Sequence, residues 1–470
     1  SNISLRFGKK ALFEEVNIKF TEGNCYGIIG ANGAGKSTFL KILSGELEPT
    51  TGEISLGPGE RLSVLEQDHF KYDDQIVLDT VIAGNQKLYD IMKEKDAIYM
   101  KEEFTDEDGI KAAELEGEFA TMNGWEAESD AENLLNGLGI ETDLHYKTMK
   151  DLLGPQKVKV LLAQALFGNP DILLLDEPTN YLDVQHIEWL KRYLQEYENA
   201  FILISHDVPF LNSVVNIIYH MENQRLDRYV GDYDKFLEVH EAKKAQLEAA
   251  YKRQQQEIAQ LQDFVARNKA RVSTRNMAMS RQKKLDKMDV IELAKEKPKP
   301  EFNFLEARAS GKCIFETEDL VIGYDEPLSR PLNLYMERGE KIAIIGTNGI
   351  GKSTLLKSLL GIVPALSGKV ELGDYLYKGY FEQEMAGTDN TCLEEIWQEF
   401  PGYSQYEVRS ALAKCGLTTK HIESKVRVLS GGEQAKVRLC KLINRETNLL
   451  ILDEPTNHLD VEAKDELKRA

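Results

Sequence analysis

The same eleven-residue pattern occurs twice in this 470-residue chain, and the repeat limits the possible folds more than any other feature. GANGAGKSTFL spans residues 30–40, and GTNGIGKSTLL spans residues 346–356. In each copy an apolar run, CYGIIG or KIAIIG, precedes the glycines, and helix-forming residues follow the GKS. A strand, a glycine-rich turn and a helix in this order let backbone amides surround phosphate oxygens at a helix N-terminus. The repeat therefore predicts two α/β domains, each with its own phosphate-binding loop (P-loop).

A second repeated motif places acidic residues after an apolar run. LLLDEPTNYLD spans residues 173–183 and LILDEPTNHLD spans residues 450–460. Each run predicts a buried strand ending in two acids, the first placed to hold Mg²⁺ and the second to polarise an attacking water. The candidates are Asp176 with Glu177 and Asp453 with Glu454. The first copy adds His206 in FILISHD, for which we expect a γ-phosphate contact, the alternative being a structural histidine.

The P-loops supply the candidate nucleotide-binding residues. Their lysines are expected to reach the β- and γ-phosphates and their serines to bind Mg²⁺. The set is Gly30, Asn32, Gly33, Gly35, Lys36, Ser37 and Thr38 in the first copy, and Gly346, Asn348, Gly349, Gly351, Lys352, Ser353 and Thr354 in the second. Phe7 and Tyr324 lie upstream of the two loops, where each could stack on adenine or belong to the core of the first sheet.

The spacing of the repeats locates an insertion. Gln67 in LEQ and Gln383 in FEQ keep the offset of the P-loops, whereas the offset between Asp176 and Asp453 is 39 residues shorter. The first copy therefore carries 39 extra residues between Gln67 and Asp176. The charged, proline-free stretch at about 85–135 predicts a helical excursion from the domain surface.

The segment between the two copies predicts a helical hairpin. Apolar residues recur at alternating steps of four and three, with one polar exception, Gln254, at Leu247, Tyr251, Gln254, Ile258, Leu261 and Val265. A second series, Leu285, Met288 and Ile291, follows a tip near 266–280. A first helix of about 25 residues would be roughly 37 Å long, and the KEKPKP run at 295–300 would end the hairpin.

Charge is distributed unevenly. The chain carries a net charge of −20, yet residues 265–288 hold eight basic residues against Asp286 alone. Clustered arginine and lysine bind phosphate backbones, although such a run is often only a solvated helix face. The candidate RNA-binding residues are Arg267, Lys269, Arg271, Arg275, Arg281, Lys283 and Lys284.

Composition narrows the class of protein further. Five cysteines lack CxxC spacing, which favours reduced thiols in the cytoplasm and disfavours a zinc module. No stretch approaches the roughly 18 consecutive apolar residues of a membrane helix, so we expect no membrane partner. The internal duplication makes a monomer with intramolecular cassette pairing sufficient.

LSGGEQAKVRL at 429–439 resembles the signature of ATP-binding cassette proteins, and P-loop, glutamine, signature, DEPTN and histidine follow in the cassette order. In that family two cassettes meet head to tail, so each ATP is held by one P-loop and the other cassette's signature. The resemblance implies ATP and Mg²⁺ as cofactors, ATPase activity, phosphate contacts from Ser430, Gly431 and Gly432, and metal ligation by Ser37, Gln67, Asp176, Ser353, Gln383 and Asp453. It also implies Glu177, Glu454 and His206 as catalytic residues.

Tandem cassettes with an insert in the first and a basic hairpin between them resemble the ABC-F translation factors, in their housekeeping form. The implied architecture is a first cassette at 1–237, a linker like the tRNA-interaction motif at 238–300 and a second cassette at 301–470. Each cassette would have a mainly parallel α/β core, an antiparallel subdomain and a helical signature subdomain. The counterpart of His206 would fall near position 483, so we expect the second cassette to be incomplete at its C-terminal end.

The resemblance further implies a place in translation. The closed, ATP-bound protein would bind the ribosomal E site, contact rRNA and peptidyl-tRNA through the hairpin, and touch ribosomal proteins near the L1 stalk through the insert. ATP hydrolysis would drive release. Antibiotic resistance by ribosome protection is the nearest alternative, a transporter ATPase subunit is a more distant one, and a DNA-repair ATPase lacks its zinc cysteines or longer coiled coil here.

The first signature departs from the pattern. Aligning KVLLAQAL at 159–166 with KVRLCKLI at 436–443 sets LLGPQ against LSGGE. Leu153 then replaces Ser430, Pro155 replaces Gly432 and Gln156 replaces Glu433, which removes a hydroxyl and a backbone donor. We expect a competent site on the first P-loop and a second site that binds ATP but hydrolyses it slowly. Tyr181 also stands where the second copy has His458.

Overall fold

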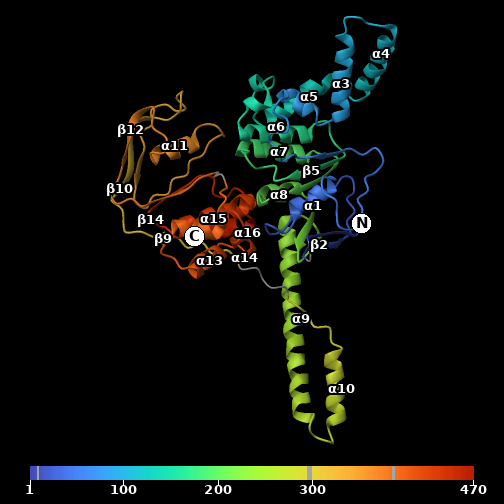
Figure 1. Cartoon of the computed structure of the whole chain (residues 1–470), viewed down its shortest axis with the longest axis vertical. Helices are drawn as coiled ribbons and strands as arrows, with labels where there is room; N and C mark the ends of the chain where they lie inside the picture. Colours follow the sequence, from blue (N-terminus) through green and yellow to red (C-terminus); the bar gives the residue numbers. More distant parts are fainter. Residues whose placement is uncertain (8–9, 294–298, 384–386) are drawn as a thin grey trace.

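The computed structural model describes residues 1–7, 10–293, 299–383 and 387–470, with the side chains of Phe7 and Lys10 outside that description. Two α/β cassettes lie side by side, and two helical projections leave the first of them in opposite directions (Figure 1). The predicted fold class, two cassettes joined by a helical hairpin, is confirmed. No helix among the described residues has the length and apolarity needed to cross a membrane.

The first cassette is built on a six-stranded sheet with the strand order β4-β5-β6-β3-β7-β8. All neighbours are parallel except β7 and β8, which form an antiparallel pair. The inner strands β5, β6, β3 and β7 run mostly through apolar, buried sequence, as expected for a parallel sheet covered on both faces, whereas the edge strand β8 is largely polar and exposed. Their bounds are β4 Leu62–Val64, β5 Ile172–Asp176, β6 Ala200–Ile204, β3 Cys25–Ile29, β7 Ile217–Glu222 and β8 Arg225–Val230.

Two cores hold this cassette together. On one side of the sheet, Phe13 and Phe39 pack edge to face beside Ile28, joining the antiparallel pair β1 (Ile3–Phe7) and β2 (Lys10–Val16) to the sheet. The other core joins the sheet to the helices. Those helices are α2 Val77–Ile82, α5 Ala127–Gly137, α6 Gly154–Leu166, α7 Val184–Gln195 and α8 Val208–Val214, with short 3₁₀ turns η1 Gly124–Glu126, η2 Thr142–Leu144 and η3 Met149–Asp151. Helix α1 (Lys36–Leu43), which carries Phe39, belongs to the first core.

The predicted insert contains two antiparallel helices, α3 (Gln86–Tyr99) and α4 (Asp106–Thr121), which project from the cassette (Figure 1). Thr105 caps α4 through a reciprocal capping box with Asp108. Between the helices, the buried Lys95 ammonium lies 3.9 Å from the Phe119 ring centroid and 3.4 Å from a Glu116 carboxylate oxygen. The helical prediction for this stretch is confirmed.

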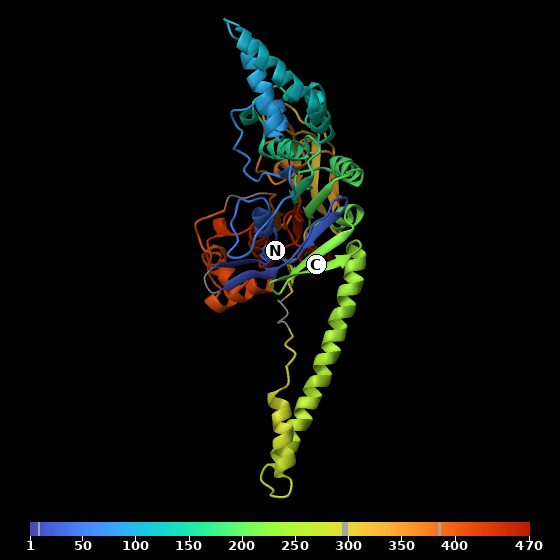
Figure 2. The ribbon, with the colours of Figure 1, turned by 90° about the vertical axis from the view of Figure 1, so that its right-hand side faces the viewer.

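The hairpin between the cassettes is less symmetric than predicted. Its first helix, α9, spans Tyr233–Asn268, and its second, α10, spans only Arg275–Asp286. Asp232 caps α9, because its carboxylate accepts a hydrogen bond from Lys235 N at 2.9 Å. α9 has 36 residues, so it is about 54 Å long at 1.5 Å per residue and exceeds the predicted 37 Å. Figure 2 shows both helices running to the tip.

The prediction that the second apolar series lies on one helix is wrong in part. Leu285 lies in α10, whereas Met288 and Ile291 lie beyond its end. Gln254, the polar exception in the repeat of α9, fixes this return segment: its amide donates to Asp289 O at 2.7 Å and accepts from Ile291 N at 2.7 Å. Beyond the end of α10, hydrogen bonds from this polar side chain hold the returning segment against α9 in place of packing between helices. Most of the KEKPKP run lies outside the described residues.

The described residues of the second cassette form three small sheets. β10 (Cys313–Val321) pairs antiparallel with β11 (Tyr335–Glu337) and β12 (Ser367–Leu372). The parallel pairs are β13 (Lys378–Phe381) with β15 (Leu449–Leu452), and β9 (Leu305–Glu306) with β14 (Glu446–Thr447). Its helices are α11 Lys352–Leu359, α12 Cys392–Glu399, α13 Gln405–Lys414, α14 Thr419–Ile422, α15 Gly431–Ile443 and α16 Val461–Arg469, with the 3₁₀ turn η4 Val426–Val428.

The prediction of a strand before the second P-loop is wrong. Residues 341–346 form no strand, and Ile345 is 89% exposed. The equivalent β3 of the first cassette is held by β6 and β7 on its two sides. No strand among the described residues pairs with 341–346 in this way. A strand needs neighbours to pair its backbone groups.

Candidate active site

The two P-loops have nearly the same conformation. Gly33 and Gly35 have φ of 76° and 107°, and Gly349 and Gly351 have 82° and 101°. These left-handed values require glycine. Lys36 Nζ donates to Gly30 O at 2.7 Å and Ala31 O at 3.0 Å, and Lys352 Nζ donates to the equivalent Gly346 O and Thr347 O, each at 2.8 Å. Each lysine therefore folds back over its own loop, with the helix N-terminus beneath it. Thr38 and Thr354 lie in the first turns of α1 and α11.

Asp176, Glu177 and His206 form the first acidic corner, at the ends of the adjacent strands β5 and β6. The Ser37 hydroxyl bonds the Asp176 carboxylate; burial raises the pKa of Asp176, while Ser37 and Lys36 oppose the rise. Glu177 has φ of 51°, a strained value for a residue other than glycine. Its Oε2 accepts a hydrogen bond from His206 N at 3.3 Å.

Burial sets the protonation of this corner. It raises the pKa of Glu177 to about 8, with the Asp176 carboxylate as the second cause. Burial also lowers the pKa of His206 to about 3, followed by the charge of Lys36. Glu177 Oε1 lies 3.3 Å from His206 Nε2 yet makes no hydrogen bond with any residue that the structure describes. A buried carboxylate oxygen without a partner fits a water molecule or a phosphate-bound group placed beside it.

The second acidic corner comprises Asp453, Glu454 and Gln383. Glu454 has φ of 46°, matching Glu177. Its Oε2 accepts from Gln383 Nε2 at 2.7 Å and from Asn457 Nδ2 at 2.6 Å. Asp453 Oδ2 is buried, and no described residue forms a hydrogen bond with it. Gln67, the counterpart of Gln383, is exposed on the loop after β4, and no hydrogen bond among the described residues joins it to the first corner.

Oxygen-rich donor sets in both copies fit Mg²⁺, which prefers hard oxygen ligands and keeps several waters. The first copy offers the adjacent Ser37 hydroxyl and Asp176 carboxylate. In the second, Ser353, Gln383 and Asp453 line a cavity of about 150 Å³. Pro155 and Tyr181 of the first cassette line the same cavity. The site on the second P-loop is therefore shared between the cassettes.

The intact signature lies against the first P-loop. Ser430 caps α15 in a capping box with Glu433. At Gly432, an added Cβ would come within 2.3 Å of Asn32 Nδ2, so only glycine allows this approach. Ser430 and Gly431 occupy the same turn. Leu153, the counterpart of Ser430, begins α6 with its side chain 70% exposed. The two shared sites therefore receive different signatures, as the alignment of LLGPQ with LSGGE indicates.

A second set of contacts relates the cassettes by approximate two-fold symmetry. Asn32 Nδ2 donates to His458 O at 3.4 Å, and Asn348 Nδ2 donates to Tyr181 O at 2.7 Å. The Tyr181 and His458 rings meet edge to face, with centroids 6.3 Å apart. Both residues have positive φ, 65° and 63°. Tyr181 and His458, which occupy corresponding positions in the two copies of the motif, therefore contact each other across the interface.

Further interface residues were missed at the sequence level. Asp183 Oδ2 accepts from Asn348 N at 3.3 Å, and Lys464 Nζ donates to His206 O at 3.0 Å. Asp183 and Asp460 end the repeated DEPTNxLD motif and cap α7 and α16, so their repetition was a usable signal. Nothing in the sequence around Lys464 marks it as a contact across the interface.

The structure locates the side chain of one of the two candidate adenine-stacking residues, Tyr324. Tyr324 is 60% exposed on a loop whose Ile322 and Leu328 lie within 3.4 Å of a Cβ built on Gly351. It is therefore beside the second P-loop and outside the core. The side chain of Phe7 lies outside the description, so its role stays a prediction.

Paired P-loops, acidic strand ends and a signature presented across the interface define an ATPase with two nucleotide-binding cassettes. Family models described as "ABC transporter" match residues 13–180 and 329–457, and another with that description matches residues 219–304. The chain belongs to the ABC transporter family of ATP-binding proteins, and it is an ATP-hydrolysing enzyme.

Several known proteins resemble the whole chain. It is 61% identical to "Uncharacterized ABC transporter ATP-binding protein YfmM" of Bacillus subtilis, over 100% of this chain and 92% of that protein. It is 47% identical to the protein YkpA of the same organism, over 98% and 87% of the two chains. Among solved structures, the complex of "archaeal ribosomal stalk protein aP1 and archaeal ribosome recycling factor aABCE1" aligns with a TM-score of 0.58 and 21% identity, covering 100% of this chain and 81% of that one.

Proposed function

We propose that this ATPase is an ABC-F-type translation factor that binds the ribosome while its cassettes are closed on ATP and leaves when ATP is hydrolysed. The observation that carries the proposal is the basic tip of the hairpin. A helix about 54 Å long carries this tip away from the rest of the protein, which is acidic. ATP closes the interface described above, and the closed shape presents the hairpin. Hydrolysis then times release.

The proposed chemistry uses the first P-loop site. Lys36 and the loop amides bind the phosphates, and Ser37 with Asp176 positions Mg²⁺, which when bound neutralises charge on the transferred phosphoryl group. Glu177 orients and polarises the attacking water through its free Oε1. His206 holds Glu177 and faces the γ-phosphate, and Ser430 with Gly431 and Gly432 closes over it. Glu454 has the equivalent role at the second site, where Leu153 and Pro155 weaken closure.

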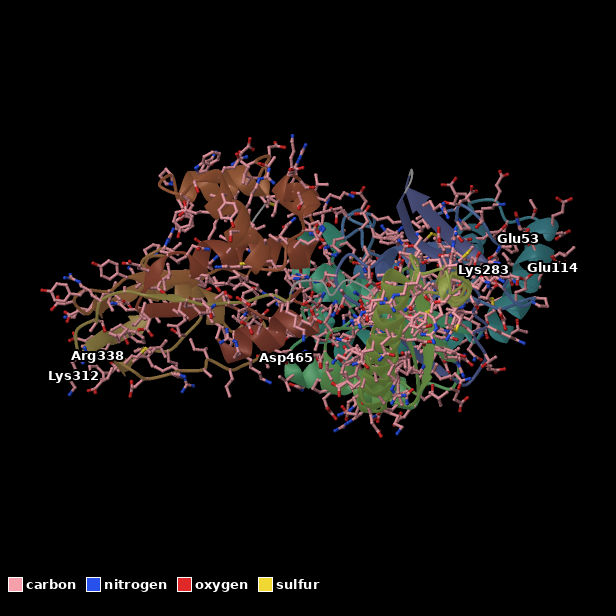
Figure 3. The ribbon with its side chains drawn as sticks, turned by 90° about the horizontal axis from the view of Figure 1, so that it is seen from below. Glu53, Glu114, Lys283, Lys312, Arg338 and Asp465 are labelled. Carbon is pink, nitrogen blue, oxygen red and sulfur yellow. The ribbon has the colours of Figure 1, made fainter. Side chains whose placement is uncertain are left out.

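The hairpin side chains divide the seven candidate RNA contacts into two groups. Arg267 pairs with Asp263 at 3.0 Å, Lys284 pairs with Glu257 at 2.6 Å, and the Arg281 guanidinium lies 3.7 Å from the Phe264 ring centroid. No ion pair with a described residue engages the exposed Lys269, Arg271, Arg275 or Lys283. We expect these four to meet phosphates first, because binding breaks no internal contact. Figure 3 looks along the hairpin and shows Lys283 beneath the first cassette, far from Lys312 and Arg338.

The remaining proposals follow from this one. The hairpin would contact rRNA and peptidyl-tRNA from the E site, and the projection of α3 and α4 would reach ribosomal proteins near the L1 stalk. The cytoplasm is the expected compartment, and a monomer suffices because both halves of each site belong to one chain. The structural likeness to a ribosome recycling factor supports the two-cassette arrangement.

The test is cosedimentation with ribosomes. A Glu177→Gln, Glu454→Gln protein, which should retain ATP, is layered with ribosomes on a sucrose gradient with and without ATP. We expect ATP-dependent comigration that weakens as salt rises, since phosphate contacts release counterions. Replacing Lys269, Arg271, Arg275 and Lys283 with glutamine should abolish it.

A charge-matched control replaces four exposed lysines elsewhere, Lys19, Lys150, Lys420 and Lys468, with glutamine. This variant should still comigrate. If the protein stays at the top of the gradient under all conditions, or if both quadruple variants lose binding equally, the ribosomal proposal is wrong.

A further inference from the structure

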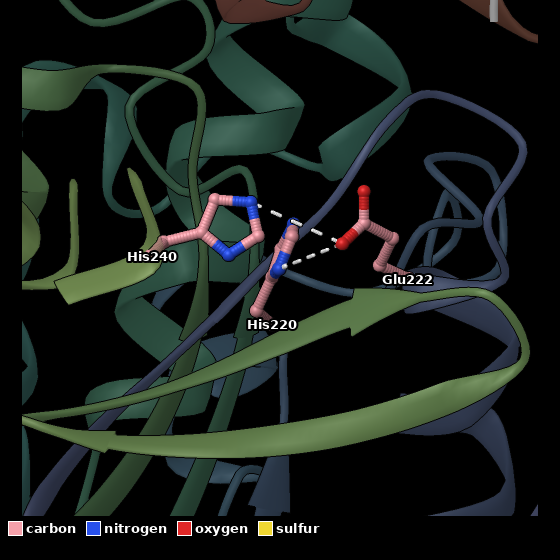
Figure 4. Close-up of side chains that lie close together, drawn as sticks. All are labelled: His220, Glu222 and His240. Carbon is pink, nitrogen blue, oxygen red and sulfur yellow. Dashed lines mark ion pairs between the residues drawn. The ribbon is translucent and has the colours of Figure 1, made fainter. Parts of the chain in front are cut away.

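Two histidines and a glutamate meet where the hairpin leaves the first cassette (Figure 4). His220 and Glu222 are two positions apart on β7, so their side chains share one face of the sheet. His240 comes from the second turn of α9. One ligand atom from each lies within 4.8 Å of the other two. We call these three residues the histidine cluster.

The nitrogen atoms are oriented toward a common point. His220 Nδ1 lies 3.8 Å from Glu222 Oε2, and His240 Nε2 lies 3.9 Å from the same oxygen. His220 Nδ1 is buried and has no hydrogen-bond partner in the part of the chain that the structure describes. His240 Nδ1 lies 3.3 Å from Tyr229 Oη; with its proton donated there, Nε2 presents its lone pair to the cluster. Metal-bound histidines commonly have such a partner on the second nitrogen.

The surroundings of His220 favour its neutral imidazole, the form that binds metal. The Phe236 ring stacks on His240 at 5.3 Å and lies 5.0 Å from His220. Burial, followed by the nearby His240, lowers the pKa of His220 to about 4. A cation can enter from solvent, because Glu222 also lines an open cavity of about 950 Å³ together with Asp227. Asp227 is the cross-strand partner of His220, so it adds a carboxylate on the same face.

We propose that the histidine cluster binds a divalent first-row transition-metal ion, with Zn²⁺ the best match, and that the ion ties the base of α9 to β7. Two imidazoles and a carboxylate suit Zn²⁺, which binds such ligands at about 2.0–2.2 Å and keeps a fourth position for water or another ligand. Mg²⁺ and Ca²⁺ prefer all-oxygen sites and fit this set poorly. The ligand atoms must draw closer around the ion, and Glu222, whose side chain is 50% exposed, is free to rotate toward it.

This location would link the hairpin to the first P-loop. β7 pairs with β3, and His220 is the register partner of Ile29, the residue before Gly30. A Cβ on Gly30 would come within 2.6 Å of Met221 O. An ion at the cluster would therefore fix the hairpin to the strand that supports the nucleotide loop. This inference is independent of the ribosomal proposal.

The test is metal binding by the full-length, chelator-treated protein without nucleotide. Zn²⁺ is titrated in competition with a chromophoric chelator, and Co²⁺ is added in parallel to record its visible absorption. We expect one equivalent of Zn²⁺ and a Co²⁺ spectrum typical of four-coordinate nitrogen and oxygen ligation. His240→Gln and Glu222→Gln should each lower affinity by more than about 100-fold, and Tyr229→Phe by about 10-fold, as removal of an outer-shell partner does.

His69→Gln is the matched control, since it removes a histidine outside the cluster and should leave Zn²⁺ affinity unchanged. Glu222→Gln guards against misfolding, because that side chain is half exposed; its circular dichroism should match the unmodified protein. The proposal is overturned if the unmodified protein binds Zn²⁺ no better than the His220→Gln, His240→Gln double variant. It is equally overturned if His69→Gln loses as much affinity as His240→Gln.

Discussion

The two P-loops differ less than the segments that lead into them. β3, before the first loop, is buried between two parallel strands, whereas 341–346, before the second, is exposed and forms no strand. Yet the glycine torsions differ by no more than a few degrees, and both lysines bond equivalent carbonyls. The loop conformation is therefore set locally, by glycines and the helix after them, and does not require the central strand.

The two signature motifs differ in their chemistry although their backbone geometry is alike. Ser430 and Leu153 begin equivalent helices, α15 and α6, with similar backbone torsions, but only Ser430 carries a hydroxyl. Local geometry is shared here and chemistry is not. Because each signature faces the other cassette's P-loop, a substitution in one signature should affect the nucleotide site on the other cassette. The predictions below test this crossed asymmetry, beginning with the largest effect.

Removing the proposed bases should separate the two sites most strongly. Glu177→Gln should lower single-turnover ATP hydrolysis by about 100-fold or more, as loss of general-base catalysis does. Glu454→Gln should lower it by less than about 10-fold, because its site faces Leu153 and Pro155. Rapid-quench measurement of phosphate release from one equivalent of ATP gives both rates. Equal losses in the two variants would contradict the asymmetry.

Exchanging signature residues should move activity across the interface. Ser430→Leu should lower single-turnover hydrolysis about 100-fold through loss of one phosphate donor. Leu153→Ser should change it little, since Pro155 still removes a backbone donor. Ser430 also caps α15, so Ser404→Leu, which breaks the equivalent capping box of α13, is the control. It should lose about 1 kcal/mol of stability and keep its ATPase rate; an equal loss of rate would assign the Ser430 effect to folding.

The first acidic corner should make stability depend on pH. Glu177 has a folded pKa of about 8 against an ordinary 4.5, so the folded state holds a proton that the unfolded chain releases between these values. Stability of the nucleotide-free protein should therefore fall as pH rises through this range, by at most about 1.4 kcal/mol per pH unit. Glu177→Gln removes this cost, so urea unfolding should show the variant gaining relative stability from pH 5 to pH 8. A constant difference would contradict the burial of this carboxyl group.

The smallest effect concerns the two asparagines of the interface. Asn348→Ala removes a 2.7 Å bond to Tyr181 O, and Asn32→Ala removes a 3.4 Å bond to His458 O. A carbonyl left without its donor costs about 1 kcal/mol, so Asn348→Ala should weaken ATP-dependent closure about fivefold and Asn32→Ala less. Fluorescence energy transfer between dyes on the two cassettes would measure closure. A larger loss in Asn32→Ala would reverse the assigned order.

Motifs within one stretch of sequence were predictable, because their chemistry is local. The P-loops and the strand ending at Asp176 follow from residue types and spacing. The failure at 341–346 has the opposite cause, since a central strand depends on partners remote in the chain. Gln254 looked like an imperfection in a repeat, and only its distance to the backbone at 289–291 explains it.

Residues brought together from separate elements were the hardest to predict. His220 and Glu222 alternate on one strand, which hinted at a shared face, but nothing connected them to His240 on α9. Lys464 reaches His206 across the interface with no motif around it. Such contacts depend on how the cassettes and hairpin meet, which residue spacing does not encode.

The uninterrupted length of α9 has a mechanical consequence. It contains neither proline nor glycine between Tyr233 and Asn268, and those are the usual causes of kinks. A rigid rod of about 54 Å turns a rotation of about 5° at its base into a displacement of about 5 Å at its far end. Its base packs beside β7 and β8, next to the nucleotide loop. Any rotation of the cassette surface beneath the base of α9 would therefore be enlarged along the helix before it reaches the tip.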